Sequence, residues 1–330
     1  MLSKKVKILG QVIAPGETHQ LSLNIAKLHT GSTIEVPVIV SRSKEPGPTI
    51  LFTGGIHGNE INGVEIVRKI ISEKYHIPTT GMVICIPVVN VFGFISQTRE
   101  FPDGRDLNRV FPGSLRGSLA SRFAFHIVKE IVPHIDYCID FHTGGDSRFN
   151  APQIRIGKND NESLQLAKTF GTRFIIKSAK REKSFRETLY KLQKKVLLFE
   201  GGKSLNINND VTKIGISGAL KVMQQLGIRS FQKELALIKS NSDISYLVKD
   251  SSWVRAKYSG LFHPTIQLGQ YVKKGDDIGS LSDPFGFFEK KQKSIYAGYV
   301  ICINQSPIVN QGDAIVHITT DALEIEPQQL

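Results

Sequence analysis

Short, continuously apolar segments alternate along the first half of the chain with segments of helical periodicity. Residues 49–53 and 82–90 are apolar runs of strand length, and residues 61–75 between them carry apolar side chains at helical spacing. A second amphipathic segment, 118–131, precedes another apolar run at 137–141. Uniformly apolar strands are typical of a sheet that is covered on both faces. The alternation therefore predicts an α/β domain with helices on both faces of a largely parallel sheet.

The pattern changes near residue 240. Beyond it the helical periodicity fades, and short β-like runs alternate with turns that are rich in glycine. Residues 1–45 also carry short β-like runs separated by turns. We predict two domains: an α/β domain over residues 1–240, which includes the N-terminal β segment, and a smaller all-β domain of barrel or sandwich type over residues 241–330.

The chain of 330 residues has a formal net charge of +12. Such a balance favours anionic partners, namely nucleic acid, acidic membranes or small acidic substrates, although a solvated basic surface is the simpler explanation. The densest basic segment, residues 177–195, is interpreted as an exposed helix face. No nucleic-acid-binding motif or set of aromatic platforms accompanies it, so we expect no nucleic-acid partner.

Cys85, Cys138 and Cys302 each lie in an apolar run. Their odd number and wide spacing argue against a disulfide framework and favour a reducing compartment. The N-terminal segment carries no apolar stretch of signal-peptide length, and no run approaches the roughly 20 apolar residues of a membrane span. We expect a cytoplasmic protein without a membrane partner, and the sequence leaves open whether it forms homo-oligomers.

Two histidines and a glutamate follow the predicted strands. His57 and Glu60 lie three residues apart in the glycine-rich loop after residues 49–53, and His142 follows the strand at 137–141. Sites in open α/β sheets form where the carboxyl ends of the strands meet. Catalytic zinc commonly uses three protein ligands, and two histidines with one glutamate are an established set. An HxxE pair is also common without a metal, but the glycine-rich loops strengthen the prediction of a zinc site.

Two further segments carry polar groups that suit catalysis or carboxylate binding. The loop 103–113 offers Arg105, Asn108 and Arg109, and Arg99 lies just before it. The planar guanidinium matches a carboxylate in a bidentate manner, although Asp-Gly and Pro-Gly are also ordinary turn sequences. Glu200 ends the apolar run 196–199, where a carboxylate beside a zinc-bound water could accept and return a proton. On its own, a glutamate at a strand end is more often a surface residue.

Four motifs occur in a fixed order: GGIHGNE at 54–60, DGRDLNRVFPG at 103–113, DFHTGG at 140–145 and FEGG at 199–202. Together they resemble the succinylglutamate desuccinylase/aspartoacylase family of the zinc carboxypeptidase superfamily. The ordered set is specific, and the surrounding pattern covers nearly the whole chain. The resemblance implies a zinc-carboxypeptidase-like mixed sheet and one zinc ion per chain.

The resemblance also implies a role for each matching residue. His57, Glu60 and His142 match the zinc ligands, and Glu200 matches the general base and acid. Asn108 and Arg109 match residues that hold the substrate carboxylate. A further arginine of the family polarises the scissile carbonyl, and its place before the DLNR motif favours Arg99, with Arg105 as the second candidate.

The implied activity is that of a zinc-dependent amidohydrolase, a deacylase that cleaves the amide bond of a small, anionic N-acyl amino acid. Zinc-bound water would be the nucleophile. The alternatives are a zinc metallocarboxypeptidase acting on peptides and a non-catalytic zinc-binding protein. The motifs do not identify the acyl group. We expect loops 144–152 and 177–186 to select it.

The C-terminal segment is similar to the β-rich domain of these amidohydrolases and to the barrel-sandwich fold of biotinyl and lipoyl domains. Those carrier domains display a modified lysine at a hairpin tip. Lys273 and Lys274 fit such a turn, but the carrier signature of a lysine between methionines is absent from the sequence. We therefore predict a structural module that covers the mouth of the site.

Overall fold

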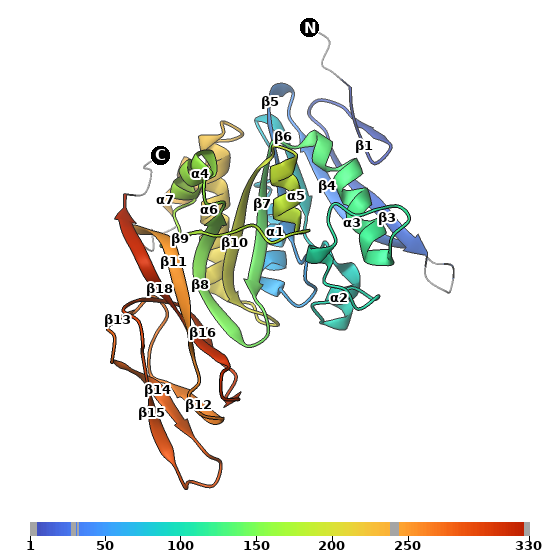
Figure 1. Cartoon of the computed structure of the whole chain (residues 1–330). Coiled ribbons are helices and arrows are strands. Elements are labelled where there is room, and N and C mark those ends of the chain that lie inside the picture. Colours follow the sequence, from blue (N-terminus) through green and yellow to red (C-terminus); the bar gives the residue numbers. More distant parts are fainter. Residues whose placement is uncertain (1–4, 28–30, 32, 238–243, 327–330) are drawn as a thin grey trace.

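The computed structural model describes residues 5–27, 31, 33–237 and 244–326. Within them, one twelve-stranded mixed sheet extends through the molecule, and β1 and β2 form a small hairpin beside it (Figure 1). The strands of the first part are β1 (Val6–Ile8), β2 (Gln11–Ile13), β3 (Thr18–Lys27), β4 (Thr33–Arg42), β5 (Glu45–Gly54), β6 (Thr80–Ile86), β7 (Tyr137–Gly144), β8 (Arg148–Ile156), β9 (Phe174–Lys177) and β10 (Lys195–Lys203).

Helices connect these strands, and those predicted at 61–75 and 118–131 are confirmed. The helices are α1 (Ile61–Ser72), α2 (Val91–Ser96), α3 (Leu119–Glu130), α4 (Asn161–Phe170), α5 (Phe185–Lys191), α6 (Asn209–Gln225) and α7 (Gln232–Ala236), with the 3-10 turns η1 (Leu107–Arg109) and η2 (Val132–His134). None of the helices in the described segments is both long and apolar enough to cross a lipid bilayer.

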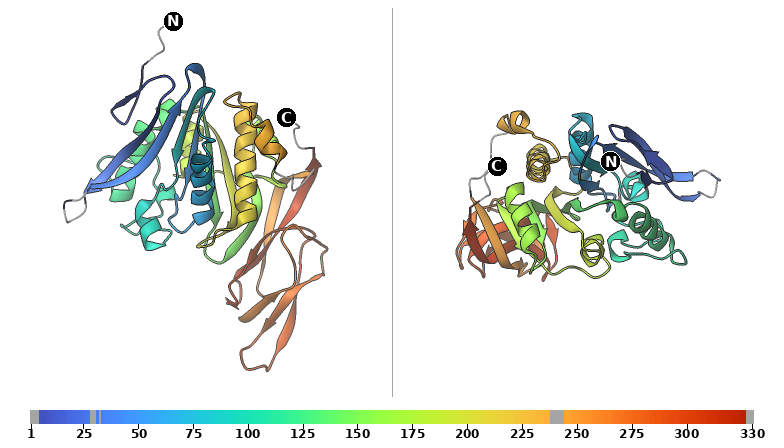
Figure 2. Two further views of the ribbon diagram at one scale, coloured as in Figure 1. Left: turned by 180° about the vertical axis from the view of Figure 1, so that it is seen from behind. Right: turned by 90° about the horizontal axis from the view of Figure 1, so that it is seen from above.

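The helices cover both faces of the sheet, as the apolar strands predict. Ile50 and Phe52 of β5 pack in one core with α1, α4 and α6, whereas Leu51 points the other way into a core with α3 and α5. Figure 2 shows α1 and α6 in front of the sheet when the molecule is viewed from behind. Because successive side chains of a strand alternate between faces, a fully apolar run is buried from both sides.

The centre of the sheet is parallel, and this positions the site. The strands β6, β5, β7 and β10 lie side by side in that order. Thr53 of β5 is level with Asp140 of β7, and His142 of β7 is level with Glu200 of β10. The carboxyl ends of these strands therefore meet at one edge, where the predicted polar residues gather.

Two expectations for the first part need correction. The strands predicted as short in residues 1–45 include β3 and β4, which are ten residues each and antiparallel. Alternating buried residues of β4, Val36, Val38 and Val40, pack this pair onto the core that contains α3. The segment predicted as one long loop after residue 92 contains α2 and η1, because Asn90 caps α2 by accepting a hydrogen bond from the Gly93 amide.

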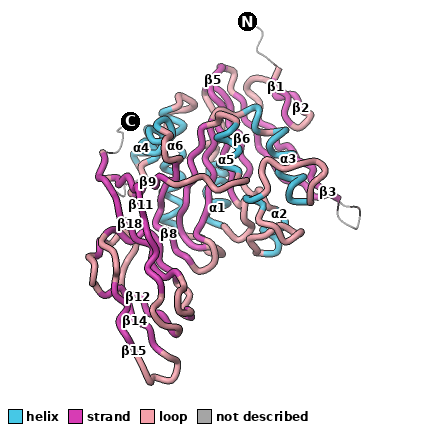
Figure 3. Tube along the Cα trace, viewed as in Figure 1, coloured by secondary structure: helices cyan, strands magenta, loops and turns pink. Residues whose placement is uncertain are grey.

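Residues 244–326 form strands and loops, which confirms the predicted change from helical segments to short β-strands near residue 240 (Figure 3). The predicted boundary itself, 240/241, lies outside the described residues. The strands are β11 (Ser245–Arg255), β12 (Gly260–Pro264), β13 (Tyr271–Val272), β14 (Asp277–Ser282), β15 (Glu289–Lys293), β16 (Gly298–Asn304), β17 (Ile308–Val309) and β18 (Ala314–Ile325). Of these, β15, β14, β12 and β17 form a separate four-stranded sheet.

The remaining C-terminal strands join the main sheet. Strand β11 pairs with β9 and β18, β18 pairs with β16, and β16 pairs back with β8, so that β8, β9, β11, β18 and β16 form a closed ring. Buried apolar side chains from four of these strands pack together: Ala151, Phe174, Ile176, Val248 and Ile301. The ring fixes the C-terminal strands against the carboxyl edge of the sheet, so their side chains reach the site.

Candidate active site

The loop after β5 carries the first two members of the site, and its shape depends on glycine. A Cβ atom at Gly58 would lie 1.8 Å from the backbone carbon of Gly93 in α2, which is closer than any real contact. Glycine therefore lets the loop pack directly on the backbone of α2. The chain then turns into α1, and Glu60 is the residue that precedes its first helical turn. This geometry turns His57 and Glu60 toward β7.

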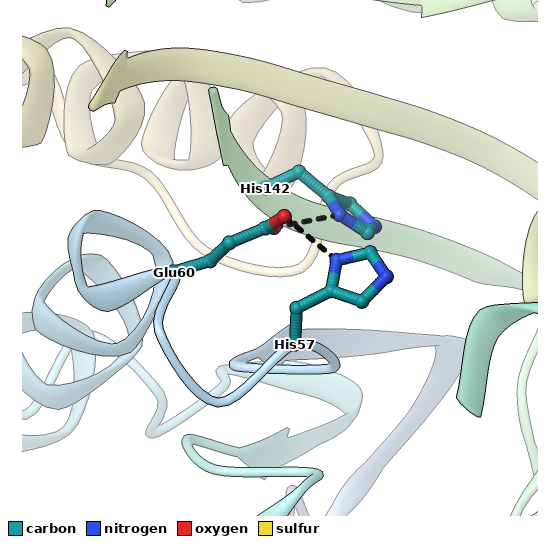
Figure 4. A group of neighbouring side chains, drawn as sticks. All are labelled: His57, Glu60 and His142. Atoms are coloured by element: carbon teal, nitrogen blue, oxygen red, sulfur yellow. Dashed lines mark hydrogen bonds and ion pairs between the residues drawn. The ribbon is translucent and has the colours of Figure 1, made fainter. Parts of the chain in front are cut away.

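His57, Glu60 and His142 form one buried group, which we call the histidine–glutamate cluster (Figure 4). Glu60 Oε1 lies 2.7 Å from His57 Nδ1, and Glu60 Oε2 lies 2.9 Å from His142 Nδ1. One possible ligand atom from each residue lies within 4.8 Å of the others, and all three residues are at most 3% exposed. The structure thus brings these three predicted residues together.

Carboxylates behind the cluster orient both imidazole rings. His57 Nε2 lies 3.1 Å from Asp106 Oδ1, and His142 Nε2 lies 2.8 Å from Asp140 Oδ2. Asp140 also accepts a hydrogen bond of 2.7 Å from the Thr53 hydroxyl. Metal-binding histidines usually direct their second nitrogen at a carboxylate in this way. Both Nδ1 atoms are thereby directed at Glu60, so the donor set fits a divalent metal ion.

Charge within the cluster also fits a cation. Burial alone would raise the pKa of Glu60, but His57 and His142 outweigh it and hold this pKa well below its ordinary value. Burial would lower the pKa of His142, whereas Asp140 and Glu60 raise it well above the usual range. The buried carboxylate is therefore ionised and is balanced by imidazolium. A divalent ion would supply the same balance, because the rings then bind it in their neutral form.

The loop 99–109 contributes unequally to the site. Arg99 donates to Glu60 over 3.2 Å and to Asp106 over 2.8 Å, so it lies directly beside the cluster. Asn108 accepts a hydrogen bond from the Phe185 amide, and Arg109 donates to the Asn108 carbonyl. Both residues line the same cavity as the cluster. Arg105 does not line that cavity: its side chain is 54% exposed and lies 3.4 Å from Asp103.

Glu200 lies at the same edge of the sheet. Its position level with His142 on the neighbouring strand places both side chains on one face. Asn150 donates a hydrogen bond of 2.8 Å to Glu200 Oε2, and Arg155 lies 3.5 Å from Glu200 Oε1. Glu200 lines the cavity that contains the cluster.

The cavity has a volume of about 620 Å³, which is typical of small-molecule sites. Both loops expected to select the acyl group contribute to its wall. The segment 177–195, however, is not one exposed helix face: β9 ends at Lys177, a loop follows, and α5 begins only at Phe185. Arg186 is 6% exposed and lines the cavity, because Phe185 and Leu189 on either side anchor α5 in the core.

Sequence reasoning did not single out several residues of this site. Asp106 and Asp140 each lie inside one of the four sequence motifs and contact a histidine of the cluster in the structure. An acidic residue within such a motif was the signal available in the sequence. Arg155, Trp253 and His317 line the cavity from β8, β11 and β18, and no local pattern marks them. The last two come from the C-terminal strands, which reach the site through the closed ring of strands.

Comparisons with known proteins agree with this architecture. Residues 46–226 match the succinylglutamate desuccinylase/aspartoacylase catalytic domain. An N-alpha-acetyl-L-2,4-diaminobutyric acid deacetylase of Halomonas elongata is 28% identical over 298 residues, which are 86% of this chain and 85% of that protein.

Solved structures show the same fold. A succinylglutamate desuccinylase/aspartoacylase from Rhodobacter sphaeroides superposes with a TM-score of 0.81 at 26% identity, over 92% of this chain and 95% of its own. The ectoine utilization protein EutE from Ruegeria pomeroyi superposes with a TM-score of 0.80 at 21% identity, over 93% and 98% of the two chains. The family match covers more than half of the chain and contains the cluster, the DLNR loop and Glu200. The protein belongs to the succinylglutamate desuccinylase/aspartoacylase family.

Proposed function

We propose that this protein is a zinc-dependent amidohydrolase that removes the acyl group from a small N-acyl amino acid. The observation that carries the proposal is the single cavity of about 620 Å³ that contains both the histidine–glutamate cluster and Glu200. His57, Glu60 and His142 would hold one zinc ion. Such an ion, when bound, lowers the pKa of a coordinated water to about 7 and polarises a carbonyl group.

Glu200 is the general base and acid of the proposed reaction. It accepts a proton from the attacking water and returns it to the amide nitrogen as the carbon–nitrogen bond breaks. The water oxygen remains on the acyl carbon, so the products are a carboxylic acid and a free amine. Asn150 holds the Glu200 carboxylate with a hydrogen bond of 2.8 Å, which keeps one oxygen fixed while the other handles the proton.

Two groups of polar residues position the substrate. Arg99, which contacts Glu60 and Asp106, lies where it can stabilise negative charge on the carbonyl oxygen. Asp106 begins the DLNR turn, and Asn108 and Arg109 at its other end bind the substrate carboxylate. The backbone of this turn is fixed by Asp106, which accepts a hydrogen bond from the Asn108 amide. Ordered donors of this kind favour one orientation of the substrate.

A peptidase would need a site that admits a polypeptide. Here Trp253 and His317 of the C-terminal strands line the cavity together with the catalytic residues. A volume of about 620 Å³ lies within the range of small-molecule sites. These features support a small substrate over a peptide.

Amine release from a panel of N-acyl amino acids and short peptides tests the proposal. We expect the zinc-loaded protein to release amine from at least one acylated amino acid, and the chelator-treated protein to release none until zinc is restored. Release from peptides alone would favour a carboxypeptidase. Zinc binding without release from any compound would contradict the proposed activity.

A further inference from the structure

Two large apolar side chains are exposed at the end of the hairpin formed by β14 and β15. Phe285 is 76% exposed and Phe287 is 86% exposed, and no large apolar side chain among the described residues is more exposed than Phe287. Their rings stack with centroids 5.8 Å apart. The hairpin extends away from the body of the molecule (Figure 1 and Figure 2). We call Phe285 and Phe287 the phenylalanine tip.

The turn that carries the phenylalanine tip is held in one shape. The Asp283 carboxylate accepts hydrogen bonds from the amides of Phe287 and Phe288, at 2.8 and 3.3 Å. Phe288 is half-buried, and its ring lies 6.2 Å from the ring of Tyr258. Because the turn is fixed before a partner binds, little conformational entropy is lost when the tip is covered. Exposed apolar groups on such an ordered element are typical of an interaction surface.

A second group of exposed apolar side chains lies beside the loop 55–60. A Cβ atom at Gly58 would lie 2.2 Å from the amide nitrogen of Phe94 in α2. The Asn59 carbonyl accepts a hydrogen bond of 2.8 Å from the amide of Leu205, in the loop between β10 and α6. The two segments therefore flank the same loop, and together they present four apolar side chains that are between 37% and 73% exposed. These are Phe94, Ile95, Leu205 and Ile207, which we call the apolar patch.

The charges around both surfaces favour another protein as the partner. The nearest charged residues on either side of the phenylalanine tip are acidic, Asp283 and Glu289, and they disfavour an anionic membrane or a nucleic acid. Neutral polar residues adjoin the apolar patch in the sequence, namely Gln97, Asn206 and Asn208. An apolar centre with few charges and a polar rim is the usual composition of a protein–protein interface.

We infer that the phenylalanine tip of one copy of this protein packs against the apolar patch of a second copy. Because the two surfaces differ, a single contact would leave one tip and one patch free and would continue into a filament. A two-fold axis closes the assembly, since each copy then offers its tip to the patch of the other. The hairpin and α2 both lie on the lower side of the molecule in Figure 1, so two copies can face each other in this way.

The contact is large enough for a stable dimer. A phenylalanine side chain buries roughly 150–250 Å². In the closed dimer both tips are covered, and each covers a comparable area on the patch that it meets. Together these surfaces amount to on the order of 1,000 Å² or more, which is the size that specific interfaces reach. The patch adjoins the loop that carries His57 and Glu60, so the dimer would place the tip of one copy beside the site of the other.

The mass of the protein in solution is the first test. We expect sedimentation equilibrium to give twice the mass of the chain for the wild type. The double variant Phe285→Ser/Phe287→Ser should raise the Kd of the dimer by at least about 100-fold. Ile308→Ser, which removes a 70% exposed side chain of β17 in the same small sheet, is the control and should remain dimeric. A monomeric wild type, or a dimer that the double variant leaves intact, overturns the inference.

Two single-cysteine changes test which surfaces meet. Phe287→Cys places a thiol on the tip and Ile207→Cys places one on the patch, whereas the three native cysteines are buried. A short bismaleimide should link the chains in a mixture of the two variants and should link few chains of either variant alone. Efficient linkage of Phe287→Cys alone would show that tips meet tips, and an unlinked mixture would show that other surfaces meet. Either result overturns the inference.

Vesicles separate a second copy from a lipid surface as the partner of the tip. We expect the wild type to remain in the supernatant when vesicles of phosphatidylcholine, with or without phosphatidylglycerol, are sedimented. Binding that is lost in Phe285→Ser/Phe287→Ser and retained in Ile308→Ser would assign the tip to a membrane and overturn the dimer. None of these measurements depends on catalysis, so they remain decisive whether or not the proposed deacylase activity is found.

Discussion

At the histidine–glutamate cluster, Glu60 lies within hydrogen-bonding distance of both imidazoles and of Arg99, and Asp106 and Asp140 engage the outer ring nitrogens. The other end of the same cavity, which we call the arginine end, is lined by Arg148, Arg155, Arg186, Trp253 and His317. There, Arg155 Nε has no hydrogen-bond partner among the described residues, and Arg186 donates to neutral oxygens. The first region is balanced around a position for a cation. The second carries unpaired positive charge. One cavity therefore combines the proposed metal site with a positively charged region.

Removing a member of the cluster should have the largest effect. We expect His142→Ala to lose bound zinc and activity together, because one of three ligands and the partner of Asp140 and Glu60 disappear. Zinc content by elemental analysis checks this. His317→Ala, a histidine of the same cavity outside the cluster, should retain zinc. A chelator should lower the melting temperature of the wild type and leave that of His142→Ala unchanged. A stoichiometric zinc content in His142→Ala would exclude this ligand.

A carboxylate behind the cluster should matter less than a ligand. Asp140→Asn keeps the shape of the side chain but removes the charge that faces His142 Nε2 at 2.8 Å. We expect zinc affinity to fall by about 10–100-fold, as for other outer partners of metal-binding histidines. Competition with a fluorescent zinc chelator measures the affinity. Asp146→Asn, which lines the cavity away from the cluster, is the matched control, and equal affinities for the two variants would argue against a role for Asp140.

We expect the smallest effect on the pH dependence of stability, through His317 at the arginine end. His317 has a pKa of about 3 in the folded protein because burial, Arg155 and Arg148 disfavour its charged form, whereas the unfolded chain binds the proton near the ordinary value of 6.5. Its contribution to stability is therefore present above about pH 6.5 and is lost as the pH falls toward 3. As the pH decreases over this range, we expect the free energy of unfolding of His317→Gln to fall less steeply than that of the wild type. The difference in slope corresponds to at most one bound proton. Parallel pH curves for variant and wild type would show that His317 is not held neutral.

The sequence predicted the cluster end of the site far better than the arginine end. His57, Glu60, His142 and Glu200 each follow an apolar strand, and parallel strands bring such positions to one edge. The DLNR turn was likewise marked by its motif. The helices on both faces of the sheet follow from the same alternation of apolar runs and amphipathic segments.

The arginine end depends on contacts that no local pattern encodes. Trp253 and His317 reach the cavity because β16 pairs with β8 and closes the ring of strands, which is a pairing between distant segments. Arg186 lies in a lysine-rich segment whose charge suggested an exposed helix, but two apolar neighbours bury it. Tertiary packing thus overrides the surface-like composition of this segment. The length of β3 and β4 was missed for a similar reason, since their pairing extends both strands beyond their apolar centres.

The most direct test of the proposed mechanism is the turnover of Glu200→Gln at full zinc occupancy. The amide cannot accept a proton from water, but it can still accept a hydrogen bond from Asn150, and Glu200 is not a member of the cluster. We predict that the variant binds zinc as the wild type does and that kcat falls by about 10²–10⁴-fold, the usual share of general acid–base catalysis. A zinc-loaded variant that turns over the substrate at the wild-type rate would contradict the assignment of Glu200 and the mechanism built on it.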